Sequence, residues 1–377
     1  MTDKNDFIVT PWTVKGNVDY DVLTKKFGTQ KIDENLLERI KKHTYDLHHF
    51  LRRKIFFSHR DLDFLLDEYE KGNKFFLYTG RAPSGKVHLG HLIPWMFTKW
   101  LQDKFDVELF FQFPDEEKFL FKENLNFENT EKALYDNMLD VIAVGFRPEK
   151  THFLIDTKHA NLMYKEACKV AKKITLSTAK ATFGFTDENN IGEIFYTAMQ
   201  AVPAFLPSVT ANRKIPCLIP CAIDQDPHFR ITRDVLPKLN FYKPSVIHSI
   251  FLPGLKGMDE QGKMSSSEEQ TAVFTTDNNK TVRKKIMKYA FSGGQATVEE
   301  HRKNGGNPDI DVSYQWLMFF EEDDEKLHKI YEDYRSGALL TGELKEILIN
   351  KISNYLRIHQ ERREKAGDLI EKFMFKK

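Results

Sequence analysis

Short apolar strands alternate with amphipathic helices between residues 75 and 252, and this alternation limits the possible folds more than any other feature of the chain. The pattern predicts strands at 75–79, 107–113, 152–155, 215–223 and 245–252, and helices at 91–104, 131–144 and 227–239. Strands that alternate with helices form βαβ units, whose strands lie parallel in one sheet. We therefore predict an α/β body whose ligand lies beyond the carboxyl ends of the strands.

The segments on either side of this body have different patterns. Residues 33–54 are predicted to form one helix with Asp33 as its cap, inside an N-terminal extension. After about residue 268 the strand signals fade, and helices are predicted at 280–291, 297–303, 313–320, 324–335 and 342–377. A chain of 377 residues is too long for one ordinary core. We predict an extension over 1–74, the body over 75–267 with a helical insertion near 118–210, and an all-helical part over 268–377.

Composition excludes several classes of protein. A formal net charge of +1 gives no overall signal for nucleic-acid binding, so such a partner needs local basic patches. Two candidates are 48–54 and 357–377, and for both the charge pattern alone favours a solvated helix face. No apolar run is long enough to span a membrane and the N-terminus lacks a signal-peptide pattern. Three cysteines cannot form a disulfide framework, which indicates a reducing, cytoplasmic location.

Two of the cysteines, Cys217 and Cys221, fall in an apolar run. We predict that they are buried core thiols and not metal ligands, because no fourth ligand is at hand. The sequence predicts no protein-held metal site.

The loop from Gly80 to His91 follows a predicted strand and opens a helix, which places backbone N–H groups and the positive end of a helix dipole at an anion site. Its first half reads as most of a P-loop, but Val87 stands where Ser or Thr would bind magnesium, so a P-loop NTPase is disfavoured. His88 and His91 share one face, and Gly90 leaves room for a flat ring. Such a pair can cap a helix or bind metal; after this loop it indicates adenylyl transfer.

A second loop runs from Leu255 to Ser267. Its glycines suggest a mobile segment, in which Lys263 and the hydroxyls after it offer a cation and donors to a polyphosphate. A loop of this kind could close on ATP and stabilise charge in the transition state. A polar surface loop is the alternative for this segment alone, but it is implausible beside the first loop.

These two motifs, in this order, resemble those of class I aminoacyl-tRNA synthetases. Other segments resemble the tryptophanyl-tRNA synthetases of eukaryotes and archaea, from about residue 7 to the end: 49–53 with 56–61, 183–187, 198–205 and 221–234. The chain departs from that pattern at Ala204, where many relatives have Ser, and at Pro114, which bears on the conformation of the loop before Glu117. The resemblance implies a Rossmann-like catalytic domain at 75–267, an extension packed on it and a helical anticodon-binding domain.

The resemblance also implies site residues, carried over by matched motif. Tyr78 and Gln112 would read the indole N–H, which has a donor and no acceptor. The other residues implied are Glu117, Gln200 and Gln225 for the amino-acid backbone, Arg81, Ser84, Gly90, Met264, Ser265 and Ser266 for ATP, and His88, His91 and Lys263 for catalysis. The implied activity is activation of L-tryptophan by ATP with Mg²⁺, then transfer to tRNA(Trp), by a homodimer that one tRNA spans.

Three alternatives stay open at this point. A tyrosyl-tRNA synthetase would need a carboxylate acceptor for a phenol in the pocket. A smaller nucleotidyltransferase would lack the second loop and the helical tail. A synthetase-like, non-catalytic RNA-binding protein tends to lose catalytic residues, whereas His88, His91 and Lys263 are all present.

Overall fold

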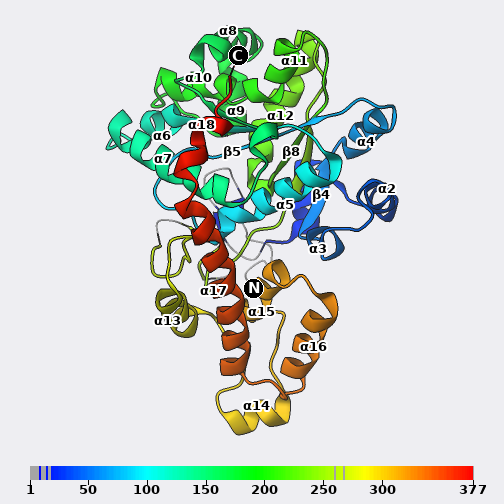
Figure 1. The fold of residues 1–377 in the computed structure, drawn as a ribbon, viewed down its shortest axis with the longest axis vertical. Helices are drawn as coiled ribbons and strands as arrows, with labels where there is room; N and C mark the ends of the chain where they lie inside the picture. The colour runs from blue at the N-terminus through cyan, green and yellow to red at the C-terminus, as the bar shows by residue number, and fades with distance from the viewer. Residues whose placement is uncertain (1–7, 10–13, 16–17, 259, 266–267, 377) are drawn as a thin grey trace.

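The structure is a computed structural model of the chain, and it describes residues 8–9, 14–15, 18–258, 260–265 and 268–376. An α/β body lies at one end of the molecule and a smaller helical part at the other (Figure 1). A single long helix near the C-terminus, drawn in red, runs from the helical part up along the body (Figure 1). Among the helices of the described residues, none is long and apolar enough to cross a lipid bilayer.

The body is built on a seven-stranded sheet in the described part of the chain, with strand order β3-β4-β9-β8-β5-β6-β7. Its strands are β3 Gln30–Lys31, β4 Phe56–Arg60, β5 Phe76–Gly80, β6 Leu109–Phe113, β7 Thr151–Ile155, β8 Cys217–Ala222 and β9 Ser245–Ser249. The five strands predicted from the sequence form the parallel portion, β4 pairs with its β9 edge in antiparallel orientation, and β3 pairs antiparallel with β4. The prediction of a Rossmann-like α/β fold is confirmed.

The order of the parallel strands determines where a ligand can lie. The chain runs outward from β5 through β6 to β7, then returns to the other side of β5 for β8 and β9. The direction of winding therefore reverses between β5 and β8, and at such a reversal a ligand-binding crevice is expected at the carboxyl ends of the two strands.

Helices cover both faces of the sheet (Figure 1). Those of the N-terminal extension are α1 Tyr20–Phe27, α2 Glu34–Thr44, α3 His49–Arg52 and α4 Leu62–Glu70. Those of residues 75–267 are α5 Leu89–Phe105, α6 Asp115–Phe121, α7 Phe127–Ala143, α8 Ala160–Ala171, α9 Leu176–Phe183, α10 Ile191–Met199, α11 Leu206–Thr210 and α12 Asp226–Val235. Short 3-10 turns lie at Pro148–Lys150, Val202–Ala204, Ile223–Gln225 and Leu236–Leu239, and a two-stranded sheet pairs β1 Ile8–Val9 with β2 Val14–Lys15. The predicted helices at 91–104, 131–144 and 227–239 correspond to α5, α7 and α12 with the turn that follows it.

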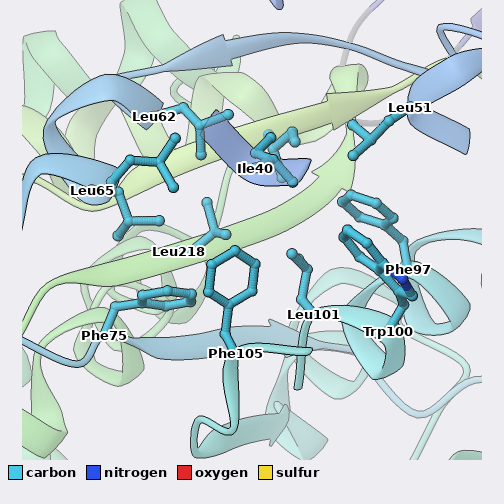
Figure 2. Close-up of a pocket in the computed structure, with 12 residues that line it drawn as sticks. Ile40, Leu51, Leu62, Leu65, Phe75, Phe97, Trp100, Leu101, Phe105 and Leu218 are labelled. Atoms are coloured by element: carbon cyan, nitrogen blue, oxygen red, sulfur yellow. The ribbon is translucent and has the colours of Figure 1, made fainter. Parts of the chain in front are cut away.

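The N-terminal extension is joined to the sheet by apolar packing. Figure 2 shows aliphatic and aromatic side chains from α2, α3, α4 and α5 meeting Leu218 of β8. The pocket that they line has a cavity volume of about 10 Å³, which is at most room for one water molecule. This region is therefore hydrophobic core and not a ligand site.

The prediction of one helix over 33–54 was wrong. Asp33 caps α2 as expected, since its Oδ1 accepts from the Leu36 N–H at 2.9 Å. The helix ends at Thr44, because Tyr45 has φ of +67°, outside the helical region, and α3 starts afresh at His49. Strand β4, which follows α3, was not predicted.

The helical part comprises α13 Asn279–Tyr289, α14 Val298–Asn304, α15 Val312–Phe320, α16 Asp324–Arg335 and α17 Thr341–Glu364. The capping box at the start of α14 is confirmed: Thr297 Oγ1 accepts from the Glu300 N–H at 3.1 Å, and Glu300 Oε2 accepts from the Thr297 N–H at 3.2 Å. These helices agree with the predicted ones except at the C-terminal end.

The predicted helix over 342–377 is interrupted. After α17 come a 3-10 turn at Gly367–Leu369 and the short helix α18 Ile370–Phe373, which lie beside the body in Figure 1. The chain then reaches the outer edge of β7, where the Phe375 N–H donates to the Phe153 carbonyl oxygen at 3.2 Å. This segment covers an edge strand that would otherwise present unpaired backbone groups.

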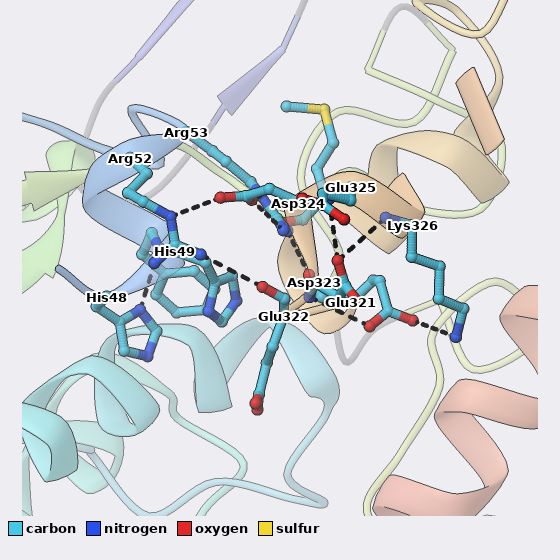
Figure 3. Close-up of polar contacts among 12 residues, drawn as sticks. His48, His49, Arg52, Arg53, Glu321, Glu322, Asp323, Asp324, Glu325 and Lys326 are labelled. Atoms are coloured by element: carbon cyan, nitrogen blue, oxygen red, sulfur yellow. Dashed lines mark hydrogen bonds and ion pairs between the residues drawn. The ribbon is translucent and has the colours of Figure 1, made fainter. Parts of the chain in front are cut away.

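The basic segment 48–54 forms a junction between the body and the helical part (Figure 3). Arg53 donates to the carbonyl oxygens of Met318 and Glu321 at the C-terminal end of α15, and His49 Nε2 lies 2.9 Å from that of Phe319. Both Arg52 and Arg53 also bind Asp324. The C-terminal carbonyls of a helix lack partners within it, so these side chains cap α15 from outside. The interpretation as a solvated helix face was wrong here.

Candidate active site

Several of the predicted site residues that the structure describes lie in or just after strands β5, β6 and β8. Tyr78 lies in β5, the loop with His88 follows that strand, and Gln112 lies near the carboxyl end of β6. Gln225 ends the 3-10 turn that follows β8. The crevice is where this strand order is expected to hold a ligand.

Gly80 and Arg81 shape the first loop. A Cβ atom on Gly80 would lie 2.7 Å from the Gln112 carbonyl oxygen, so the close approach of β5 and β6 at this point requires glycine. The Arg81 guanidinium donates to Asn137 Oδ1 at 2.6 Å and to the Ser84 carbonyl oxygen at 2.8 Å. Burial lowers the pKa of Arg81 to about 10, which leaves it a cation at neutral pH. Arg81 thus stabilises the conformation of the first loop through these hydrogen bonds.

His88 is buried, His91 is half-buried, and their rings are stacked with centroids 3.6 Å apart. The backbone N–H of His88 donates to His91 Nδ1 at 3.2 Å, which places the His91 proton on Nε2. Burial, with Arg81 and Lys263 nearby, lowers the pKa of both imidazoles well below 6.5. Both rings are therefore neutral at pH 7 and can donate a hydrogen bond without carrying a charge.

The second loop lies against the first. A Cβ atom on Gly90 would come within 3.6 Å of Met264 Cβ. Lys263 forms an ion pair with the buried carboxylate of Asp224 and lies 5.7 Å from the centroid of the Phe251 ring. Ser265 is half-buried beside them, and Ser266 lies outside the described residues. The structure thus brings together the histidine pair and the lysine that the sequence places about 170 residues apart.

The backbone of the second loop is folded back on itself through Gln261. Its Oε1 accepts from the Lys256 N–H at 3.2 Å, and its Nε2 donates to Thr271 Oγ1 at 2.6 Å. The Gly254 N–H donates to the Gly262 carbonyl oxygen at 3.0 Å. These bonds fix the conformation of the described part of the loop.

Tyr78 and Gln112 form a buried polar pair between otherwise apolar strands. The Tyr78 hydroxyl donates to Gln112 Oε1 at 2.6 Å and also lies 3.0 Å from the Gln200 carbonyl oxygen. Burial raises the pKa of Tyr78 well above 10, so its hydroxyl stays protonated. The two oxygens keep lone pairs that can accept from one further N–H group.

The remaining residues predicted to bind the amino acid are Glu117, Gln200 and Gln225, of which Gln200 contacts Tyr78 through its carbonyl oxygen. Glu117 Oε2 accepts from the Tyr196 hydroxyl at 2.9 Å, and its Oε1 accepts from Lys118. Gln200 ends α10, and its side-chain oxygen is buried without a hydrogen-bond partner in the part of the chain that the structure describes. Gln225 is half-buried at the start of α12. Pro114 is accommodated as the residue that precedes α6.

Sequence reasoning assigned no role to Asp156, Asp224 or Asn137. Asp156 follows β7 directly, and its Oδ2 accepts from Gln112 Nε2 at 2.7 Å. Its position after a predicted strand was a usable signal, because the carboxyl ends of parallel strands share one edge of the sheet. Asn137 sits within a predicted helix, where nothing in the sequence pattern distinguishes it.

Cys217 and Cys221 are buried in β8, as predicted. Burial raises the pKa of both thiols well above 9, which keeps them protonated and poor metal ligands.

Comparison with known proteins agrees with this geometry. The family model of class I tRNA synthetases (W and Y) matches residues 70–357. The tryptophan–tRNA ligase of Sulfolobus acidocaldarius is 56% identical over 98% of this chain and 96% of its own length. The tryptophanyl-tRNA synthetase of Plasmodium falciparum has a TM-score of 0.89 at 44% identity, covering 95% of this chain and 98% of its own.

A structure of the tryptophanyl-tRNA synthetase of Encephalitozoon cuniculi bound to tryptophan has a TM-score of 0.88 at 35% identity, covering 96% of this chain and 99% of its own. Sequence and structure comparisons therefore point to the same relatives, over nearly the full chain. The chain belongs to the class I aminoacyl-tRNA synthetases, in the family that serves tryptophan and tyrosine.

Proposed function

We propose that the chain activates L-tryptophan with ATP and transfers it to tRNA(Trp), as a tryptophan–tRNA ligase. The observation that carries this proposal is the meeting of two kinds of group at one crevice. Neutral histidines and a lysine suited to a polyphosphate lie near a buried Tyr–Gln pair suited to an N–H donor. The relatives named above are tryptophan enzymes, so the tyrosyl alternative is not favoured.

Tryptophan would enter with its indole toward Tyr78 and Gln112. The indole N–H is a donor without an acceptor, and the oxygens of this pair have lone pairs to receive it. Glu117, Gln200 and Gln225 would hold the α-amino and carboxylate groups, since they present acceptor and donor atoms and Gln200 contacts Tyr78. A phenylalanine side chain would leave the buried oxygens unpaired, which selects against it.

ATP would lie along the first loop, with its phosphates near the histidine pair. His91 Nε2–H and His88 would donate to phosphate oxygens, Gly90 would let the adenine ring approach the backbone, and Ser84 would border the phosphates. Arg81 would act mainly by holding the loop, given its hydrogen bonds within it. Met264, Ser265 and Ser266 would complete the site from the second loop.

The first step needs no protein nucleophile. The tryptophan carboxylate oxygen attacks the α-phosphorus, the bond to the bridging oxygen breaks, and pyrophosphate leaves with that electron pair. Lys263 would leave its ion pair with Asp224 and bind the phosphates, where it would neutralise the negative charge that develops during the reaction. Removing one such donor costs about 2.7–4 kcal/mol of barrier.

Mg²⁺ would arrive as the counter-ion of ATP. Within the described residues no group of three His, Cys, Asp or Glu side chains is arranged to hold a metal. Asp224 is the carboxylate at hand, because its Oδ1 is buried and has no hydrogen-bond partner in the described ranges. One carboxylate fits a Mg²⁺ held mostly by phosphate and water, which would offset phosphate charge.

In the second step a terminal ribose hydroxyl of tRNA attacks the adenylate carbonyl and AMP leaves. The parts of the chain would divide the work as predicted: the body over 75–267 does the chemistry, the extension over 1–74 packs on it, and the helical part over 268–377 binds the anticodon. We expect a homodimer, which analytical ultracentrifugation tests, and a cytoplasmic location, which suits three free thiols.

Pyrophosphate exchange into ATP, driven separately by Trp and by Tyr, tests the proposed function. Exchange with Trp alone is expected. Lys263→Ala should reduce it about a hundredfold or more, by the donor cost above. Lys256→Ala is the matched control, because this lysine lies in the same loop but pairs with Glu260 at the surface. Exchange with Tyr only would overturn the pocket assignment, and exchange with neither would leave a non-catalytic protein.

A further inference from the structure

The orientation of the Gln112 amide decides whether the pocket accepts or repels an indole. A glutamine amide presents an oxygen that accepts or a nitrogen that donates, and the two ends have nearly the same shape. With Oε1 toward Tyr78 the pocket offers acceptors to the indole N–H. With the amide turned over, it would offer a second donor, which an indole N–H cannot pair with.

Tyr78 cannot fix this orientation. Its hydroxyl donates to Gln112 Oε1 in the structure, but a hydroxyl accepts as readily, so it would also pair with the nitrogen of a turned amide. The Gln200 carbonyl oxygen, 3.0 Å from the Tyr78 hydroxyl, could take the hydroxyl proton in that case. Some other group must therefore determine which end of the Gln112 amide faces the pocket.

Asp156 is the neighbour that distinguishes the two ends of the amide. It is 1% exposed, and its Oδ2 accepts from Gln112 Nε2 at 2.7 Å. Its backbone is fixed as well, since the Asp156 N–H donates to the Phe113 carbonyl oxygen at 3.2 Å. An oxygen without a proton can face only the nitrogen end of the amide, which leaves Oε1 on the pocket side.

A proton shared with Glu116 does not alter this preference. Burial, together with Glu116, raises the pKa of Asp156 well above 3.8, and burial raises the pKa of Glu116 to about 7. The side chains of Asp156 and Glu116 are hydrogen-bonded to each other, whereas Asp156 Oδ2 faces the Gln112 amide nitrogen, so a proton held by the pair lies between the two carboxyl groups. Asp156 Oδ2 remains an acceptor in either case.

We propose that Asp156 is a positioning residue for tryptophan selection, which holds the Gln112 amide with its oxygen toward the indole N–H. The inference rests on the proposed function and adds to it the group that sets the polarity of the amino-acid pocket. Asp156 touches Gln112 and acts through it.

Pyrophosphate exchange with two amino acids tests this role. The first is Trp, and the second is 3-benzothienylalanine, in which sulfur replaces the indole N–H at nearly the same shape. The wild-type protein should prefer Trp in KM by roughly tenfold or more, because the analogue leaves a buried acceptor unpaired. Asp156→Asn offers both a donor and an acceptor to Gln112, so the preference should fall several-fold, with a larger change in KM than in kcat.

An exchange of the two side chains provides the rescue. In the double variant Gln112→Glu with Asp156→Asn, the new carboxylate at position 112 accepts from the new amide at position 156. Its other oxygen still faces the pocket as an acceptor, and the number of carboxyl groups is unchanged. We expect this variant to regain the preference for Trp that Asp156→Asn alone loses. The double variant tests the idea by itself if the single variant does not fold.

Asp311→Asn is the matched control. Asp311 is also buried, accepts from the Tyr334 hydroxyl and the Gly293 N–H, and lies in the helical part. The Asp311→Asn substitution should lower the stability of the protein without changing its preference between the two amino acids. A folded Asp156→Asn protein with the wild-type preference, or a folded double variant without it, would overturn the inference alone. A wild-type protein without Trp-driven exchange would overturn both the inference and the proposed function.

Discussion

Replacing Asp226 by Asn should remove a pH-dependent part of the stability of the body. This fully buried carboxylate accepts from Arg60 at 2.6 and 2.8 Å, and from His248 at 3.2 Å. Arg60 also donates to the carbonyl oxygens of Phe27 and Gly28, so the cluster ties the N-terminal extension to the start of α12. Residue 225, a predicted substrate contact, is its immediate neighbour.

The magnitude follows from the pKa of the carboxyl. Burial alone would raise the pKa of Asp226, but the hydrogen bonds from Arg60 and His248 outweigh it and lower the pKa from 3.8 to about 2. That difference corresponds to about 2 kcal/mol of unfolding free energy. Because the folded pKa lies below the unfolded one, this stability is fully present above pH of about 4. It is lost as the pH falls toward 2.

Urea unfolding followed by circular dichroism measures the effect. Between pH 5 and 7 Asp226→Asn should be less stable than wild type by about 2 kcal/mol or more, since Arg60 also loses its counter-charge. From pH 5 to pH 3 this difference should shrink by about 1 kcal/mol, because the carboxyl of the unfolded wild-type chain becomes protonated while the folded one stays largely ionised. The control is Asp67→Asn, whose carboxylate binds Arg39 at 2.7 Å but is 54% exposed, and which should change stability by less than about 1 kcal/mol. A difference for Asp226→Asn that stays constant from pH 7 to pH 3 would refute the reasoning.

Three further predictions concern the crevice and the junction. Gly80→Ala places a Cβ atom 2.7 Å from the Gln112 carbonyl oxygen and should cost about 1–3 kcal/mol in a urea titration, while raising KM for Trp. Arg53→Met removes donors from the end of α15 and should cost about 1–3 kcal/mol, with Trp-driven exchange per folded molecule unchanged. Since burial lowers the pKa of His88 and His91 well below 6.5, the exchange rate between pH 6 and 8 should show no titration near 6.5; an inflection there would mean that one ring carries charge.

The parallel sheet could be predicted because each of its strands is a short apolar run between helical patterns. Strand β4 was not predicted, since its pairing partner β9 lies almost 190 residues further along the chain and local pattern does not report such pairing. The break at Tyr45 was missed for a related reason. The apolar residues before and after it continue a helical period, while the turn depends on backbone angles that other contacts impose.

The residues of the candidate site also differ in how far the sequence alone reveals them. His88, His91 and Lys263 stand in compact motifs, and a motif can be read without knowing the fold. Asp156 has no motif, and its importance depends on its contact with Gln112, 44 residues earlier. Contacts made across a sheet edge become visible only when the neighbouring strand is known.

Helix α17 spans the distance between the helical part and the α/β body. With 24 residues it is roughly 36 Å long at the usual rise per residue. Near its C-terminal end His359 and Arg363 hold the buried Asp140 of α7, one turn from the Asn137 that braces Arg81. Tilting such a rod by roughly 5° about that anchor moves its far end by roughly 3 Å. The distance from the proposed ATP-binding loop to the proposed RNA-reading end is therefore set by the backbone hydrogen bonds of one helix, and an angular change at either end displaces the other.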